Sequence, residues 1–126
     1  MAIEERPWGT FEVLLDKLDH KVKEIYVKPK HRFSLQYHEH REEHWTIVEG
    51  IGYITQYGHE TVIRPGEYAY IPKKGVPRLE GGKDGITFIE VQRGDCREDD
   101  IIRLEDDYGR VQPSNIYATI NEFGTE

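Results

Sequence analysis

Two histidines and a glutamate lie close together in the first half of the chain, at His38, His40 and Glu43. In an extended strand successive side chains alternate between the two faces, so Gln36, His38 and His40 should point the same way. A tight turn at Arg41-Glu42 would then bring Glu43 into the following strand. Imidazole and carboxylate suit first-row divalent metals such as zinc or manganese. The spacing predicts a divalent-metal site with His38, His40 and Glu43 as ligands and Gln36 as a candidate fourth.

The same H-x-H spacing also occurs on the solvated edges of histidine-rich hairpins, so the opposite strand face decides between the two interpretations. That face carries Phe33, Leu35 and Tyr37, which are all apolar. Their burial would make the strand at least half buried, and buried polar side chains need partners. We therefore expect a polar pocket.

Length, charge and cysteine content limit the classes of protein to consider. The 126 residues are enough for one domain with its own core, and the net charge of -7 argues against nonspecific nucleic-acid binding. A small anionic ligand stays open, because a pocket can be locally basic. There is no apolar run of ~20 residues, and the N-terminal MAIEERPWG lacks a signal-peptide core, so no membrane association is expected. A single cysteine, Cys96, favours a cytoplasmic location.

Short strand-like segments separated by Gly and Pro turns predict an all-β sandwich or barrel. The charged run from Asp95 to Arg110 is typical of a solvated face. The apolar tail, residues 111–126, should pack on the barrel or on a partner subunit, and unpaired sheet edges favour a homodimer. We expect strands over residues 10–15, 22–28, 33–40, 45–57, 61–64, 67–71 and 86–92, with turns at 58–59, 65–66 and 81–85.

Several motifs resemble known sequences. His38-x-His40-x-x-Glu43-x6-Gly50 resembles the first cupin motif, and Gly66-x5-Pro72 resembles the start of the second. The runs RPWG, FSLQYHEHREEHW, IEVQRG and EDDIIRLEDDYGR resemble, in order, the cupin domain of type II phosphomannose isomerases. In many bacteria that domain is the C-terminal part of an enzyme fused to mannose-1-phosphate guanylyltransferase. The resemblance implies one cupin-type double-stranded β-helix (jelly-roll) barrel spanning residues 1–126.

One position departs from the family pattern. The family usually places a third metal-binding histidine shortly before the RLE segment, and this chain has Pro77 there. With at most His38, His40, Glu43 and Gln36 as ligands, the metal should bind more weakly than in a full site.

The resemblance implies interconversion of mannose 6-phosphate and its ketose isomer, with the metal as Lewis acid. Glu43 or His44 would shuttle the proton. Arginines suit bidentate phosphate recognition, and Arg103 is the first candidate, assigned to the catalytic group with Glu43 and His44. Arg41, Arg78 and Arg110 are candidate substrate-binding residues. The alternative is a non-catalytic or metal-poor cupin that binds a sugar or another small anion.

Overall fold

Two long antiparallel strands form the centre of the fold. The protein is represented by a computed structural model, which describes residues 2–33, 35–96 and 102–105. The central strands are β5 (Arg41–Gln56) and β8 (Arg78–Gly94), and they pair along most of their length. The other strands of this sheet are β1 (Ile3–Arg6), β2 (Gly9–Asp16), β3 (His20–Val27), β6 (His59–Ile63) and β7 (Tyr68–Ile71).

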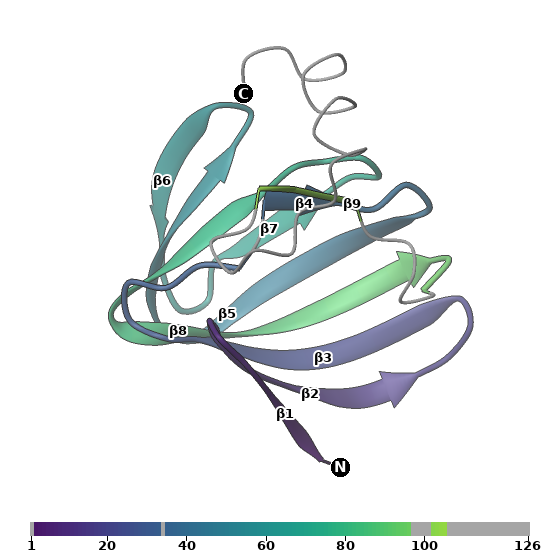
Figure 1. The fold of residues 1–126 in the computed structure, drawn as a ribbon, viewed down its shortest axis with the longest axis horizontal. Coiled ribbons are helices and arrows are strands. Elements are labelled where there is room, and N and C mark those ends of the chain that lie inside the picture. Colours follow the sequence, from purple (N-terminus) through teal and green to yellow (C-terminus); the bar gives the residue numbers. More distant parts are fainter. Residues whose placement is uncertain (1, 34, 97–101, 106–126) are drawn as a thin grey trace.

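The sheet has the order β1-β2-β3-β8-β5-β6, and β7 pairs with the other half of β5. β4 (Leu35–Tyr37) and β9 (Ile102–Glu105) form a separate antiparallel pair. Figure 1 shows the larger sheet curving around an interior, with β4 and β9 on the opposite side. The predicted all-β, double-stranded β-helix fold is confirmed.

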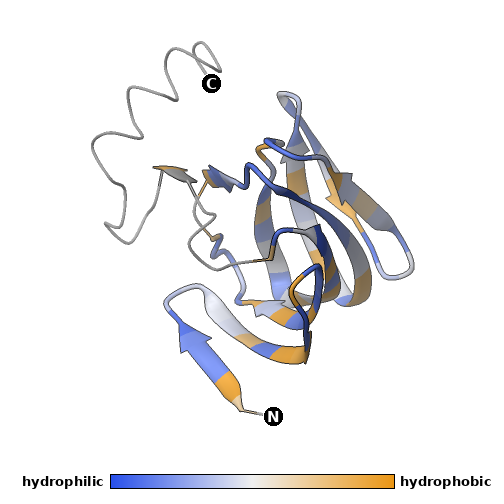
Figure 2. Ribbon diagram, turned by 90° about the vertical axis from the view of Figure 1, so that its right-hand side faces the viewer, coloured by the Kyte–Doolittle hydropathy of each residue, from blue (hydrophilic) through white to orange (hydrophobic). Residues whose placement is uncertain are grey.

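Alternation of apolar and polar residues explains why these segments form strands with one face inside. Figure 2 shows it as alternating orange and blue bands along the strands. The inward side chains meet in one core, where Val27, Ile47, Leu79, Ile86 and Phe88 are almost completely buried. Burial of such side chains is the main favourable contribution to folding.

Two predicted turns are wrong. The chain does not turn at Arg41-Glu42, because Arg41 is the first residue of β5. It does not turn at residues 81–85 either, because β8 continues through them. A Cβ on Gly81 would lie 2.3 Å from the Lys28 carbonyl oxygen, and one on Gly82 would lie 2.6 Å from that of Ile51. These glycines permit close backbone approach within the barrel rather than a reversal of the chain.

The C-terminal predictions fall partly outside the described residues. Within the charged run 95–110, β9 places Leu104 in a buried position, so this part of the run is not a solvated face. The tail, residues 111–126, lies outside the described residues, and its packing stays a prediction. Among the described residues, no helix has the length and apolar character needed to cross a membrane.

Candidate functional site

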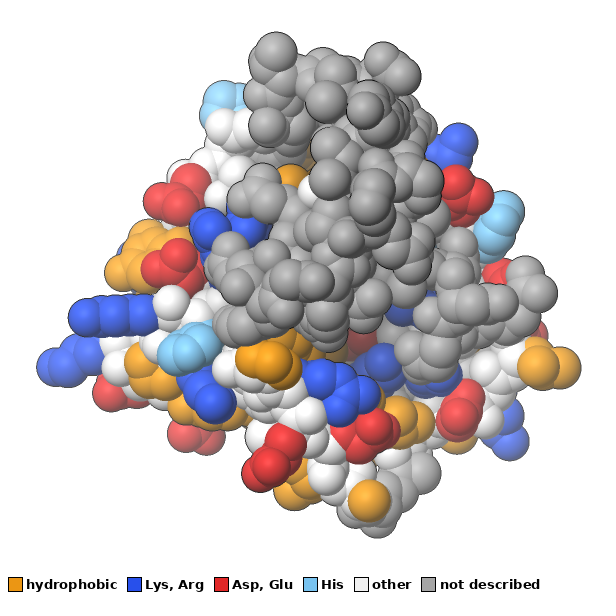
Figure 3. Space-filling model, viewed as in Figure 1, with side chains coloured by type: hydrophobic (Ala, Val, Ile, Leu, Met, Phe, Trp, Pro, Cys, Tyr) orange, Lys and Arg blue, Asp and Glu red, His pale blue; other side chains and the backbone are white. Residues whose placement is uncertain are grey.

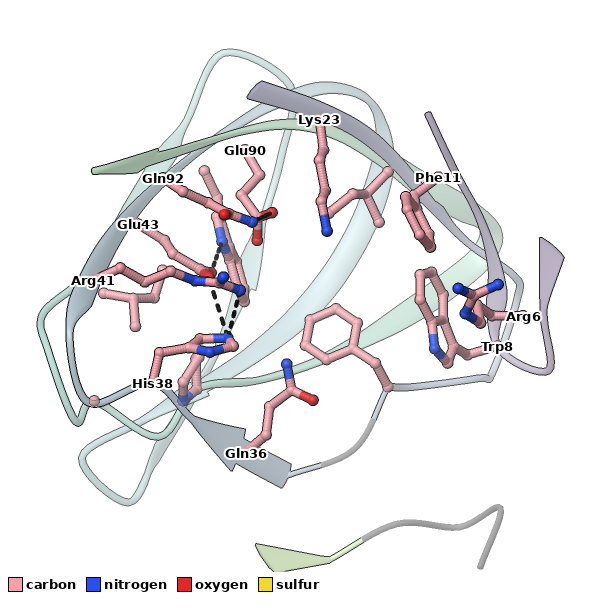
Figure 4. Close-up of a pocket in the computed structure, with 16 residues that line it drawn as sticks. Arg6, Trp8, Phe11, Lys23, Gln36, His38, Arg41, Glu43, Glu90 and Gln92 are labelled. Carbon is pink, nitrogen blue, oxygen red and sulfur yellow. Dashed lines mark hydrogen bonds and ion pairs between the residues drawn. The ribbon is translucent and has the colours of Figure 1, made fainter. Parts of the chain in front are cut away.

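A pocket opens inside the barrel, between β4 on one side and β2, β3, β5 and β8 on the other. We call it the barrel pocket. Its lining is aromatic in one part and charged or amide-bearing in another (Figure 4). The aromatic side chains are Trp8, Phe11, Phe33 and Trp45, and the charged, imidazole and amide side chains are Arg6, Lys23, Gln36, His38, Arg41, Glu43, Glu90 and Gln92.

The aromatic part is a continuous row of edge-to-face contacts. Phe33 lies between two indoles, with ring centroids 5.8 Å from Trp8 and 5.6 Å from Trp45. The Lys23 ammonium lies 4.6 Å from the centroid of the Phe11 ring. Edge-to-face packing is a favourable arrangement of aromatic rings, and these rings together form an apolar wall.

Next to the Trp45 end of the aromatic row, Arg41, His38 and Glu43 form a buried ionic group. The Arg41 Nη2 atom donates to His38 Nε2 at 3.0 Å, and Arg41 Nε lies 3.4 Å from Glu43 Oε2. The same carboxylate oxygen lies 3.4 Å from His38 Nε2. The other oxygen accepts a hydrogen bond of 2.9 Å from the Trp45 indole. Dashed lines in Figure 4 mark these contacts. Glu43 and Trp45 share a face of β5 because they are two residues apart.

A second polar pair comes from β8. Gln92 Nε2 donates to Glu90 Oε2 at 2.8 Å, and both side chains are buried. Burial, and then the neighbouring Glu43 carboxyl, raise the pKa of Glu90 from its ordinary 4.5 to about 8. The Glu90 carboxyl is therefore mostly protonated near neutral pH. The Gln92 carbonyl oxygen is buried and accepts no hydrogen bond from the described residues.

The pocket is locally basic although the chain is acidic overall. Three cationic side chains line it, from Arg6, Lys23 and Arg41, against two carboxyl groups. On the outer surface, by contrast, Figure 3 shows basic and acidic side chains interspersed over the visible described part. The net charge of -7 is therefore not the charge that a ligand in the pocket would meet.

The predicted metal ligands are only partly brought together. Gln36, His38 and Glu43 line the pocket, whereas the His40 side chain is 57% exposed and lies 3.7 Å from Glu39. The prediction that His40 points into the barrel is wrong, because β4 ends at Tyr37 and the alternation that places Gln36 and His38 in the pocket does not continue past His38. Beyond it, the His40 carbonyl accepts a hydrogen bond from the Asp95 amide, so its backbone belongs to the rim.

The remaining predicted residues are dispersed. Arg41 lines the pocket, but Arg78, which begins β8 opposite Thr55, is not among the lining residues. His44 is exposed on the opposite face of β5 from Glu43, with its ring 4.9 Å from that of Tyr70. Arg103 pairs through its backbone with Gln36 in β4, and nothing is described of its side chain. Arg110 lies outside the described residues, so the roles predicted for it and for Arg103 stay predictions.

The pocket residues do not fit the divalent metal that the cupin resemblance implies. Zinc binds imidazole and carboxylate at about 2.0–2.2 Å, so an ion on His38 Nε2 would lie within about 5 Å of the Arg41 guanidinium. Pro77 lines the pocket without offering a ligand. Within the described part of the chain, no group of three or more His, Cys, Asp or Glu side chains is placed to hold a metal ion.

Sequence reasoning missed Glu90, Gln92 and Lys23. The sequence does carry a signal for Glu90 and Gln92. Ile86, Phe88, Glu90 and Gln92 are spaced two residues apart and so share one face of a strand, and along that face the residues change from apolar to polar. Apolar residues that precede polar ones on a single buried face indicate a strand that passes from the core into a pocket.

A curved antiparallel sheet closed around a polar pocket defines the cupin class of double-stranded β-helix proteins. Residues 3–106 match the family described as mannose-6-phosphate isomerase C-terminal, and the chain belongs to this family. Its fold is similar to that of KdgF from Halomonas, with a TM-score of 0.70, 14% identity and coverage of 79% of this chain and 92% of that one. A double-stranded β-helix protein from Klebsiella pneumoniae also matches with a TM-score of 0.70, at 19% identity over 82% of this chain and 84% of that one.

The curated relatives are much longer proteins. Mannose-1-phosphate guanylyltransferase ManC of Salmonella typhimurium is 41% identical over 108 residues, which are 84% of this chain and 22% of ManC. The alginate biosynthesis protein AlgA of Pseudomonas aeruginosa is 44% identical over 108 residues, again 84% of this chain and 22% of the relative. The chain thus spans less than a quarter of the length of these proteins.

These relatives correct the predicted function. The prediction of a sugar-phosphate isomerase acting on mannose 6-phosphate is wrong, because several of the relatives, ManC among them, are named mannose-1-phosphate guanylyltransferases. They are enzymes, and their names connect this cupin with mannose metabolism.

Proposed function

We propose that the chain is the cupin unit of a mannose-1-phosphate guanylyltransferase system and that its barrel pocket binds the mannosyl phosphate. The relatives support this assignment, because they align over most of this chain at 39–44% identity and several of them, ManC included, are named for that reaction. In this role the cupin holds the sugar phosphate for a guanylyltransferase domain. The lone thiol of Cys96 supports a cytoplasmic location for such a system.

The observation that carries the proposal is the Gln92 carbonyl oxygen. Gln92 is fully buried and lines the pocket, and its side-chain amide oxygen is a buried atom that accepts no hydrogen bond from the described residues. A buried acceptor without a donor costs free energy, and a ligand hydroxyl would remove that cost. Ligands with several hydroxyl donors, such as hexoses, therefore suit this position.

The rest of the lining suits the other parts of a hexose phosphate. The row of Trp8, Phe33 and Trp45 offers apolar surface to the C–H face of a sugar ring. Lys23 and Arg41 supply buried positive charge for the phosphate, and Figure 4 shows both side chains directed into the pocket. A ligand with only a sugar ring, or only a phosphate, would contact only one of these two groups of side chains.

Calorimetric titration of the purified chain with mannose 1-phosphate tests the proposal, with free mannose and inorganic phosphate as partial ligands. We expect mannose 1-phosphate to bind more tightly than either. Gln92→Leu should weaken it about tenfold, as expected for loss of one buried hydrogen bond. The exposed His40 provides the control, because His40→Ala should leave the affinity unchanged. No binding of mannose 1-phosphate at millimolar concentration, or unchanged binding by Gln92→Leu, would refute the proposal.

A further inference from the structure

We propose that the Arg41 guanidinium is the resident cation of this barrel pocket and takes the place of a divalent metal. The proposal does not depend on which sugar the pocket binds. It concerns the two residues that would be the first choice as metal ligands here, His38 and Glu43, and the group that contacts both of them.

The contact between Arg41 and His38 defines the state of the imidazole. Arginine has only donors, so the 3.0 Å contact requires His38 Nε2 to be the acceptor. The Nε2 lone pair is therefore directed at the guanidinium. A metal ion needs that same lone pair, because imidazole binds metals through an unprotonated ring nitrogen.

Glu43 is engaged on both of its oxygens. Oε2 lies 3.4 Å from Arg41 Nε, and Oε1 accepts a hydrogen bond from the Trp45 indole. A metal on this carboxylate would have to displace a guanidinium that is only 5% exposed. A buried charge that loses its partner is strongly destabilising, so the displacement opposes metal binding.

The other positions at which a metal ligand would be expected do not supply a strong one. His40 points away from the pocket, and Pro77 occupies part of the lining without a ligating atom. Gln36 lines the pocket and could add only an amide oxygen, a poorer ligand for these metals than imidazole or thiolate. The cation site of the barrel is thus built from Arg41, His38 and Glu43.

The test compares metal binding in four proteins: wild type, Pro77→His, Arg41→Met/Pro77→His and Arg41→Lys/Pro77→His. Zinc is titrated calorimetrically, and zinc content is measured after dialysis. We expect the wild type and Pro77→His to retain well under one zinc per chain. Arg41→Met/Pro77→His should bind one zinc per chain at least about tenfold more tightly, because it adds an imidazole and removes the competing cation. The lysine variant keeps the positive charge and should stay poor in zinc.

Two further substitutions, His40→Ala and His38→Ala, make the result decisive. His40→Ala should change zinc binding in none of these backgrounds, because the side chain lies outside the pocket. If Arg41→Met/Pro77→His fails to fold by circular dichroism, wild type and His38→Ala decide the question alone. A wild type that binds one zinc per chain at micromolar concentration, and loses it in His38→Ala, would overturn the proposal. So would a gain of tight zinc binding by Pro77→His with Arg41 intact.

Discussion

Glu90 and Gln92 continue the inward face of β8 beyond Ile86 and Phe88, at the point where the core gives way to the pocket. Charged groups of both signs lie near Glu90. The pKa of Glu90 is raised by burial and by Glu43, and the Lys23 ammonium and the Gln92 amide only partly oppose that shift. A protonated carboxyl is both donor and acceptor, so Glu90 can hold Gln92 in place and still donate to a neighbour.

The raised pKa predicts how stability depends on pH. Between about pH 4.5 and pH 8 the folded protein keeps a proton on Glu90 that the unfolded chain releases. The free energy of unfolding should therefore fall as pH rises through this window, by at most about 1.4 kcal/mol per pH unit. Glu90→Gln keeps a neutral polar side chain and should flatten the slope. Urea unfolding at pH 5.5, 6.5 and 7.5 measures it.

The control for this prediction is Glu24 on the neighbouring strand β3, which is exposed. Glu24→Gln should leave the slope as it is in the wild type. Equal slopes in wild type and Glu90→Gln would mean that Glu90 titrates in the folded protein as it does in the unfolded chain.

At the scale of elements, the pairing of β5 with β8 depends on close backbone contact at Gly50. This residue has φ +82, and a Cβ there would lie 2.2 Å from the Gly85 carbonyl oxygen. Gly66 has a similar φ of +86, but nothing lies within 4 Å of its Cβ position. The two glycines thus separate the cost of a left-handed backbone from the cost of a clash.

We expect Gly66→Ala to lower the free energy of unfolding by about 1 kcal/mol, the usual cost of this backbone conformation for an L residue. Gly50→Ala should cost at least about 2 kcal/mol more, because the strands must separate to admit the methyl group. Urea unfolding at one pH measures both. Equal losses of unfolding free energy in the two variants would show that the paired strands β5 and β8 tolerate a side chain at Gly50.

Strand positions were predictable from the sequence where apolar residues alternate, as in β2 and β3. The prediction failed where glycine is compatible both with a turn and with a strand that lies close to another backbone segment. Gly81, Gly82 and Gly85 have the composition of a turn, but they lie within β8, close to the backbone of other strands. Local composition cannot distinguish a reversal of the chain from a close approach of two backbone segments, because the segments that approach each other are distant in sequence.

The candidate site was predictable for His38 and Glu43, and for Arg41 as a substrate-binding residue. It was not predictable for His40, because strict alternation would place its side chain with that of His38. β4 ends before His40, and a hydrogen bond from Asp95 holds the His40 carbonyl at the barrel rim. That partner is 55 residues away along the chain, beyond the reach of any local pattern.

At the scale of the whole molecule, the outer face of the larger sheet carries apolar side chains. Tyr53 of β5 and Val62 of β6 lie directly opposite each other, and each is 39% exposed. β6 ends the order of this sheet, so its outer edge pairs with no other strand among the described residues. An edge strand beside exposed apolar side chains favours pairing with a second chain.

We therefore expect a homodimer with β6 in the interface, because symmetric pairing would cover the same patch on both copies. Light scattering at tens of micromolar, on the order of ordinary working concentrations, should give the mass of a dimer. Val62→Lys places a charge in the patch and should shift the protein toward monomer. Leu18→Lys is the matched control, because Leu18 is 91% exposed in the turn between β2 and β3. A wild type that is monomeric at this concentration, or a dimer that Leu18→Lys weakens as much as Val62→Lys does, would exclude β6 as the interface.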